Sequence, residues 1–301
     1  MNKHVTRTYE TEEAYQTRAR QLVKRFKLQT GKTWFQDPLA WVLWLDELRC
    51  QLKKNSWRQY KAACVSLLEK YESRDLVFLK AKIELLNLSQ NNCKKRSKKT
   101  SSRRLKKLSK HDLREIYNEL KPRENERDEM LIIWLAAGIL TGLRPHEWWQ
   151  ARLENETLIV RNAKATNGRA NGAERFLDLS NMDDNEHYFI QRMMSLVLKR
   201  PDYDSTYLSV SRRLRKITKK LWPHRKKRPA LYSARHQFRA NAASAGISLM
   251  TQGALMGHAS AETARRHYGH KRFGSGNFRI TPAMGTQYPQ PICDPFRTQP
   301  K

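Results

Sequence analysis

Two segments of this chain carry residue types suited to chemistry on a phosphate. The first is T-G-L-R-P-H-E, which spans Thr141–Glu147. The second begins at Tyr232–His236, continues through Leu255–His258 and ends at Tyr268. Arginine guanidiniums bind phosphate oxygens as a fork, and a tyrosine hydroxyl can attack phosphorus and hold it covalently. The two segments together therefore indicate reaction at a phosphodiester.

The net charge points to the same class of partner. The 301 residues contain 59 Lys and Arg against 29 Asp and Glu, a formal net charge of +30. Such an excess is typical of proteins that bind a polyanion, and nucleic acid is favoured over a membrane surface. We expect double-stranded DNA as the partner.

Cysteine usage and hydropathy exclude several other classes of protein. The four cysteines are scattered without a C-x-x-C pair, which predicts reduced thiols in a cytoplasmic protein and neither a disulfide framework nor a metal site. We see no signal peptide after Met1. No run of about 18 apolar residues is present, so no membrane span is expected.

The chain divides into four parts by pattern. Residues 1–90 show helical periodicity and predict a small helical domain. Residues 91–108 predict a basic linker, and residues 109–270 predict a second domain that contains both segments. Residues 271–301 predict a proline-containing, loosely ordered tail.

Two basic clusters are candidate DNA contacts. The stretches 94–110 and 212–228 each hold ten Lys or Arg and no acidic residue. From the two stretches we single out the following residues as DNA-binding candidates: Lys94, Lys95, Arg96, Lys98, Lys99, Arg103, Arg104, Arg212, Arg213, Lys226 and Lys227.

Local signals in the second domain predict mainly helices with one small sheet. Ser109 is positioned to cap a helix, and Gly142 suits the end of an apolar helix. The strand-like runs 158–160 and 176–179 are separated by the turn dipeptides N-G, which predicts a β-hairpin. The expected fold class is α+β, a mainly helical protein with a small hairpin or sheet.

Residues 105–270 resemble the catalytic domain of the tyrosine recombinase, or phage integrase, family. The family's first box resembles T-G-L-R-x-x-E, which is Thr141–Glu147 here. Its second box resembles H-x-L-R-H followed by L-G-H and a tyrosine, matched here by Tyr232–His236, Leu255–His258 and Tyr268. His258 follows Arg235 by 23 residues, the family's usual spacing. Residues 1–90 resemble the family's core-binding domain more weakly.

The resemblance implies a role for each matched residue. Arg144 and Arg235 would hold the non-bridging oxygens of the scissile phosphate, and His258 would be a third donor. Tyr268 would attack phosphorus to give a 3′-phosphotyrosyl bond. The remaining implied roles are these: Lys164 in the hairpin would protonate the leaving 5′-oxygen, and Glu147 would be structural, orienting backbone or an arginine. No metal, cofactor or ATP is implied.

Three positions depart from the family's pattern. The usual histidine before the second arginine is Tyr232, which can donate a hydrogen bond but cannot act as a base near pH 7. A rival register, His236-x-x-Arg239, restores that histidine but shortens the interval to His258, so we prefer Arg235.

The other two departures concern spacing. Tyr268 lies ten residues after His258 where nine is commoner, and His267 occupies the ninth position without the hydroxyl that the reaction needs. In the hairpin, Arg161 or Arg169 is an alternative to Lys164.

The resulting expectation is a site-specific DNA recombinase or integrase from a mobile genetic element. It would act as a tetramer on DNA, with accessory DNA-bending or directionality proteins as possible further partners. The alternatives are a telomere resolvase, a type IB topoisomerase-like enzyme, and a DNA-binding regulator whose catalytic site has decayed.

Overall fold

The computed structural model describes residues 9–94, 105–120, 125–162, 171–260 and 271–289. The chain divides into two compact units, residues 1–100 and 101–301. Each unit has its own hydrophobic core. Among the described residues, no helix is both long enough and apolar enough to cross a membrane.

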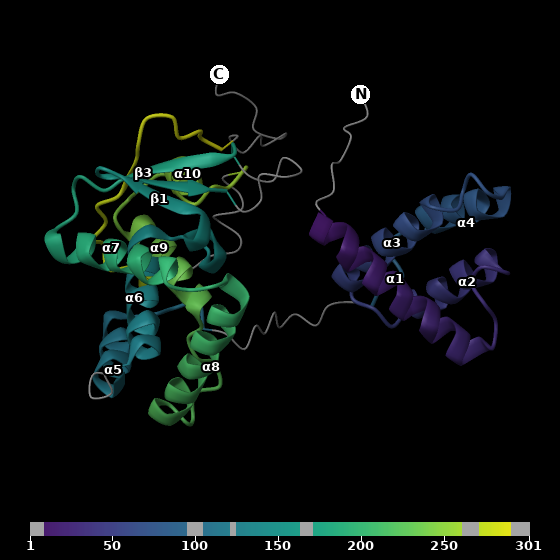
Figure 1. The fold of residues 1–301 in the computed structure, drawn as a ribbon, viewed down its shortest axis with the longest axis horizontal. Coiled ribbons are helices and arrows are strands. Elements are labelled where there is room, and N and C mark those ends of the chain that lie inside the picture. The colour runs from purple at the N-terminus through teal and green to yellow at the C-terminus, as the bar shows by residue number, and fades with distance from the viewer. Residues whose placement is uncertain (1–8, 95–104, 121–124, 163–170, 261–270, 290–301) are drawn as a thin grey trace, which may run out of the picture. The chain divides into compact units, whose positions relative to one another are not determined.

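Residues 9–94 of the N-terminal unit form a bundle of four helices (Figure 1). The helices are α1 Tyr9–Thr30, α2 Pro38–Arg49, α3 Lys54–Glu69 and α4 Leu76–Asn87. Asp37 and Asp75 cap α2 and α4 by accepting backbone N–H groups of the first turn. Trp41 and Trp57 are fully buried in the core of the N-terminal unit, so these aromatic side chains pack the helices against one another.

The second unit contains six α-helices, two short 3₁₀ helices and four strands among its described residues. The α-helices are α5 Lys110–Leu120, α6 Glu126–Thr141, α7 Asp184–Leu198, α8 Tyr203–Leu221, α9 Leu231–Ser244 and α10 Leu249–Leu255. The 3₁₀ helices are η2 Pro145–Gln150 and η4 Lys271–Phe273. The strands are β1 Ala151–Glu154, β2 Thr157–Arg161, β3 Glu174–Asp178 and β4 Thr281–Pro282.

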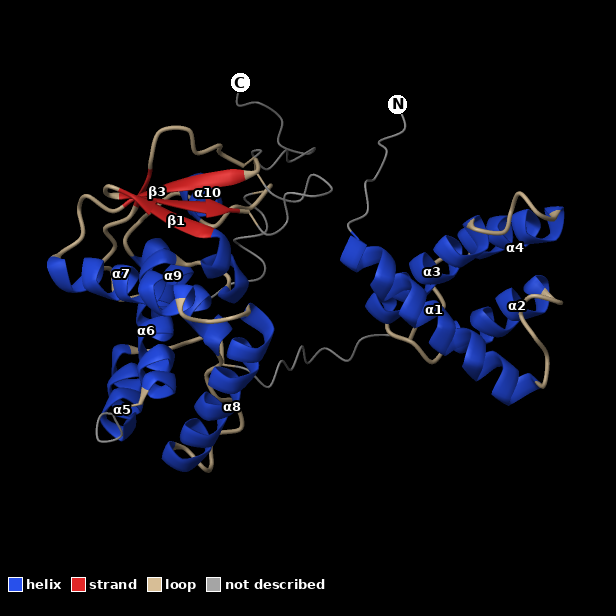
Figure 2. Cartoon of the chain, in the orientation of Figure 1, coloured by secondary structure: helices blue, strands red, loops and turns tan. Residues whose placement is uncertain are grey.

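The four strands form one antiparallel sheet in the order β1-β2-β3-β4. Figure 2 shows the strands along one side of the helical part of this unit. The predicted hairpin is confirmed as β2 and β3, with Thr157 opposite Asp178. Together with the predominance of helix, this sheet confirms the expected α+β fold class. Strands β1 and β4 were not predicted from the sequence.

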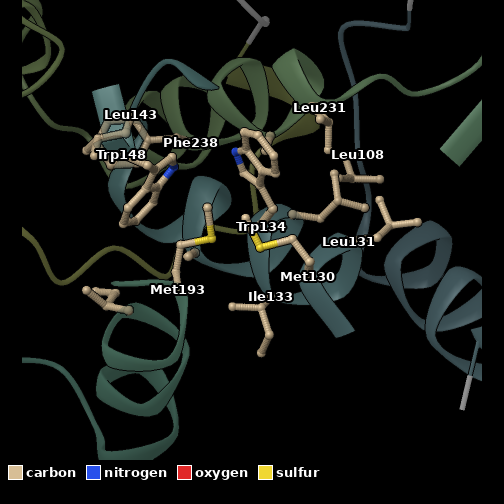
Figure 3. Packing of buried hydrophobic residues seen from close by; sticks show 14 of the residues in the cluster. Leu108, Met130, Leu131, Ile133, Trp134, Leu143, Trp148, Met193, Leu231 and Phe238 are labelled. Carbon is tan, nitrogen blue, oxygen red and sulfur yellow. The ribbon is translucent and has the colours of Figure 1, made fainter. Parts of the chain in front are cut away.

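The core of the second unit lies around α6. Trp134 and Met130 of this helix belong to one buried cluster with Phe238 of α9 and Trp148 of η2 (Figure 3). All four side chains are almost completely buried. Because α6 is buried over most of its length, the segment that leaves its C-terminus has a fixed starting point.

The two predicted ends of helices are confirmed in the second unit. The Ser109 Oγ accepts the backbone N–H of Asp112 at 3.1 Å and so caps α5. Gly142 ends α6 in the left-handed region, with φ of 68°. A Cβ at Gly142 would lie 2.7 Å from Cε1 of Phe238, so both the backbone angle and the packing require glycine.

Both ends of the predicted linker belong to the folded units. Cys93 is buried in the N-terminal core. Leu108 is buried in the core of the second unit, where its backbone N–H donates to Gln237 Oε1 at 3.0 Å. The sequence missed these two anchors because each is one apolar residue at the edge of a charged stretch.

The predicted tail is also part of the second unit as far as residue 289. Strand β4 pairs with β3, and Ile280 is buried. The backbone N–H of Phe176 donates to Thr286 Oγ1 at 2.9 Å. The expectation of a loosely ordered tail from residue 271 is therefore wrong for residues 271–289, because Thr281–Pro282 add a strand to the sheet and Ile280 and Thr286 contact the rest of the unit.

We predict that Gly142→Ala destabilises the second unit more than Gly246→Ala does. Gly246 also has positive φ, 79°, but nothing lies within 4 Å of a Cβ built there. Each substitution places alanine in the left-handed region, at a cost of about 1–2 kcal/mol. Gly142→Ala adds the clash with Phe238, and overpacking costs roughly 1–3 kcal/mol more. Calorimetric unfolding of the full chain measures both losses, and equal losses would contradict this account of Gly142.

Candidate active site

The first arginine of the predicted site lies where α6 turns into η2. Arg144 follows the left-handed turn at Gly142 and is only 6% exposed. Its backbone N–H donates to Glu147 Oε2 at 2.7 Å, and its Nη1 donates to Glu147 Oε1 at 2.6 Å. The Glu147 carboxylate therefore fixes both the backbone and the guanidinium of Arg144.

The second arginine, Arg235, lies on α9 and is fully buried. Its Nη1 donates to the carbonyl of Gly142 at 2.5 Å, and its Nη2 donates to the carbonyl of Met256 at 2.7 Å. Nη1 also lies 3.9 Å from Glu147 Oε2. These contacts place Arg235 between the end of α6 and the end of α10, so the two predicted segments meet at this side chain.

His258 is the third predicted member that the structure brings to this cluster. Its ring Nε2 lies 3.0 Å from Arg235 Nη2. A guanidinium can only donate, so Nε2 of His258 accepts this hydrogen bond and Nδ1 carries the ring proton. Burial, followed by the charge of Arg235 and its neighbours, holds the pKa of His258 well below its usual range. The ring is therefore neutral at pH 7 in this state.

The contacts of Arg235 also bear on the choice between the two registers. Arg239 lies one turn further along α9 and is buried, and burial lowers the pKa of its guanidinium. The contacts with the first box and with His258 are made by Arg235. The geometry thus favours the register in which Arg235 is the site arginine.

Tyr232 lies one turn before Arg235 on α9 and is partly buried. Its ring packs edge-on against the ring of His236, with centroids 5.3 Å apart. Burial, with the nearby charges of Lys106 and Arg235, lowers the pKa of His236 to about 4. His236 is therefore uncharged at neutral pH.

A third arginine joins the cluster and was missed from the sequence. Arg175 of β3 is 1% exposed, and its Nη2 donates to Glu147 Oε2 at 2.7 Å. The signal for it was present, because alternation along β3 places Arg175 on the same buried face as Leu177. A charged residue on the apolar face of a strand is buried with a partner.

One carboxylate thus serves three guanidiniums. Burial alone would raise the pKa of the Glu147 carboxyl, but the surrounding guanidiniums, with Arg175 the strongest contributor, hold that pKa well below its usual range. Glu147 is therefore ionised throughout the physiological range. The cluster thus gathers the guanidiniums of Arg144, Arg175 and Arg235 around the carboxylate of Glu147.

Two predicted catalytic residues lie outside the described residues. Lys164 falls in the segment 163–170 and Tyr268 in the segment 261–270. The same is true of the candidate DNA contacts Lys95, Arg96, Lys98, Lys99, Arg103 and Arg104. Among the described residues, no group of three or more His, Cys, Asp or Glu could hold a metal ion.

The described DNA-contact candidates are exposed, with one exception. Lys94, Arg212, Lys226 and Lys227 are all exposed. Arg213 is buried, and its Nε and Nη2 donate to the two oxygens of Asp128 at 2.6 and 2.5 Å. The prediction that Arg213 contacts DNA is corrected, because its guanidinium holds α8 to the start of α6.

Comparisons with known proteins identify the fold. The chain aligns with a XerH site-specific recombinase bound to palindromic difH substrate, with a TM-score of 0.51 and 15% identity, over 87% of this chain and 77% of that chain. It also aligns with the Tn1549 transposon integrase in complex with transposon right-end DNA, with a TM-score of 0.50 and 15% identity, over 88% of this chain and 90% of that chain. No family model and no curated protein matches the sequence. The chain therefore has the fold of tyrosine recombinases.

The lowered pKa of His236 predicts how stability depends on pH. The folded pKa of about 4 lies below the ordinary value of 6.5, so the unfolded chain takes up a proton first as pH falls. His236 therefore contributes stability that is present above about pH 6.5 and is lost as pH falls towards 4. We expect His236→Gln to flatten the decline in the free energy of unfolding from pH 6.5 to 4.5. The exposed His224 offers a matched control, His224→Gln, that should keep the wild-type slope.

Urea unfolding at each pH measures the free energy of unfolding of wild type and of both variants, and so tests whether the fold keeps His236 neutral. A His236→Gln variant whose stability falls as steeply as wild type over this range would show that His236 is not held neutral by the fold. The Glu147 carboxyl, whose usual pKa is 4.5, adds the same pH dependence to wild type and to both variants, so it does not affect the comparison of their slopes.

Proposed function

We propose that this chain is a tyrosine recombinase that cuts and rejoins DNA strands in site-specific recombination or integration. The observation that carries the proposal is the buried cluster of Arg144, Arg235 and His258 around Glu147. It occurs on a fold shared with recombinases whose structures contain DNA. The formal net charge of +30 supports DNA as the partner.

The two site arginines would bind the non-bridging oxygens of the scissile phosphate. Charge on these oxygens grows as phosphorus becomes five-coordinate, and guanidiniums fixed in advance stabilise that charge without reorganising. Glu147 and the carbonyl of Gly142 hold Arg144 and Arg235 in place before substrate arrives. Removal of one such donor typically costs about 2.7–4 kcal/mol of transition-state stabilisation.

Tyr268 would supply the nucleophile. Its hydroxyl would give its proton to solvent water and its oxygen would form a bond to phosphorus, while the bond from phosphorus to the 5′-oxygen breaks. Lys164 would give the leaving 5′-oxygen its proton. The product is a 3′-phosphotyrosyl link with a 5′-hydroxyl, and the link retains the energy of the phosphodiester. Rejoining by the reverse reaction therefore needs no nucleotide hydrolysis.

His258 would change its proton state when DNA binds. Its pKa is held low by burial and by neighbouring positive charge. A phosphate placed beside the arginines adds negative charge, which favours the protonated ring. In that form both ring nitrogens donate, so Nε2 would give up the hydrogen bond that it accepts from Arg235 Nη2, and His258 can become the third donor to the phosphate. Tyr232, one turn before Arg235, is a further candidate donor through its phenol.

The exposed face of α8 would track the DNA backbone. Exposed basic residues recur along this helix opposite its buried face, at Arg212, Arg215, Lys216, Lys219 and Lys220. The buried face carries Val210, Leu214 and Ile217. Exchange between two recombination sites, each bound by two protomers, would require a tetramer on cytoplasmic DNA, with DNA-bending or directionality proteins as accessory partners.

We predict covalent attachment to DNA through Tyr268. Wild-type protein incubated with nicked duplexes of randomised sequence should give a protein–DNA adduct that survives denaturing electrophoresis, because loss of the short nicked strand traps the intermediate. Tyr268→Phe should give none, since it lacks the nucleophilic oxygen. Tyr288→Phe, which removes an exposed hydroxyl, should form adduct as wild type does. If wild type forms no adduct with any duplex, the proposal is refuted.

We predict a smaller salt dependence of DNA binding for Arg212→Ala. Removal of one arginine that neutralises a phosphate lowers the slope of log affinity against log salt by about 0.9. Arg192→Ala is the matched control, because Glu129 already pairs with that guanidinium at 2.6 Å. Fluorescence anisotropy of a labelled duplex over a range of NaCl concentrations measures the slopes. A slope for Arg212→Ala equal to that of wild type would remove Arg212 from the DNA-binding face.

A further inference from the structure

Arg175 contacts three separate segments of the second unit. Its Nη2 donates to Glu147 Oε2 at 2.7 Å, in the first box. Its Nε donates to the carbonyl of Leu255 at 2.9 Å, just before His258. Its Nη1 donates to Asn162 Oδ1 at 2.6 Å, at the end of β2. All three nitrogens of one buried guanidinium are thus directed at different parts of the candidate site.

The contact with Glu147 decides how that carboxylate is oriented. Oε1 of Glu147 accepts from Arg144 at 2.6 Å, and Oε2 accepts from Arg175 at 2.7 Å. The backbone N–H of Arg144 also donates to Oε2 at 2.7 Å, and Nη1 of Arg175 lies 3.4 Å from Oε1, so each arginine contacts both oxygens and the carboxylate is held from both sides. A rotation of Glu147 would move the guanidinium of Arg144 with it.

The contact with the Leu255 carbonyl fixes the approach to His258. Arg175 and Arg235 come from different elements and bind the successive carbonyls of Leu255 and Met256. Gly257 follows with φ of 60°, and a Cβ there would lie 3.1 Å from Arg175 Nη1 and would clash with Asn162. The backbone that carries His258 is therefore packed directly against the Arg175–Asn162 pair.

The contact with Asn162 extends the network to the hairpin. Nδ2 of Asn162 donates to the carbonyls of Asn171 and Gly172 at 3.0 and 3.1 Å. Its backbone N–H donates to the carbonyl of Ala173 at 2.8 Å. Asn162 therefore joins the two ends of the segment 163–170, and its Oδ1 connects that junction to Arg175.

We propose that Arg175 is a positioning residue that sets the first-box carboxylate, the backbone before His258 and the base of the β2–β3 hairpin at fixed distances from one another. It acts through Glu147 and Asn162 and does not itself touch the phosphate. This inference rests on the proposed function, and it names a determinant of rate in that reaction.

The test compares Arg175→Lys with Arg213→Lys. Both arginines are buried and bind a carboxylate through two nitrogens, and lysine keeps the charge while losing the fork. The probe is a nicked duplex, selected from the randomised set, to which wild type attaches covalently. Single-turnover cleavage and duplex affinity are measured for each variant, together with the Tm of the full chain.

We expect Arg175→Lys to slow cleavage by about 10²-fold, the usual consequence of a misplacement near 1 Å, with duplex affinity within about twofold of wild type. Arg213→Lys should lower the Tm similarly but leave the cleavage rate within a few-fold. Equal slowing by both variants would mean that Arg175 serves only stability, and would overturn the inference.

Asn162→Ala keeps the test decisive if Arg175→Lys does not fold. It removes the hairpin contact but leaves the Arg175–Glu147 pair, and we expect cleavage to slow by about 10-fold or more. If the folded Arg175 and Asn162 variants cleave DNA at the wild-type rate, the inference about Arg175 is refuted but the proposed function is not. Failure of wild type to attach to any duplex would instead refute the proposed function.

Discussion

The candidate site depends on the sharing of one buried carboxylate among three guanidiniums. Oε1 of Glu147 lies 2.6 Å from Nη1 of Arg144. Oε2 of Glu147 lies 2.7 Å from Nη2 of Arg175 and 3.9 Å from Nη1 of Arg235. Burial of a guanidinium without compensation is costly. Here the compensation comes partly from the carboxylate and partly from backbone carbonyls. The arrangement holds several positive charges together inside the second unit and gives a phosphate a favourable place to bind.

The carbonyl groups come from the ends of two helices. Gly142 ends α6, and Leu255 and Met256 end α10. The last carbonyls of a helix carry partial negative charge and lack partners within the helix. Arg235 donates to both helix ends, and Arg175 donates to one of them. The fold thus satisfies its own helix termini with the side chains that the proposed reaction needs, so stability and pre-organisation of the site have the same source.

Local spacing in the sequence predicts which residues of the candidate site lie close together. The interval from Arg235 to His258 and the T-G-L-R turn at Gly142 are short-range features, and the structure brings these residues together. Arg175 was missed and Arg213 was assigned to DNA binding because each binds a carboxylate far away in sequence, 28 and 85 residues respectively. A run of basic residues does not distinguish the one whose helix position faces inward, and in α8 that residue is Arg213.

We propose that this cluster binds a scissile phosphate for attack by Tyr268, and the chemical identity of the attachment point tests this role most directly. Tandem mass spectrometry of the nuclease-trimmed, protease-digested adduct locates the nucleotide on the peptide. We expect a 3′-linked nucleotide on the tyrosine of the peptide containing Tyr268. A nucleotide on any other residue, or one linked through its 5′-phosphate, would contradict the account.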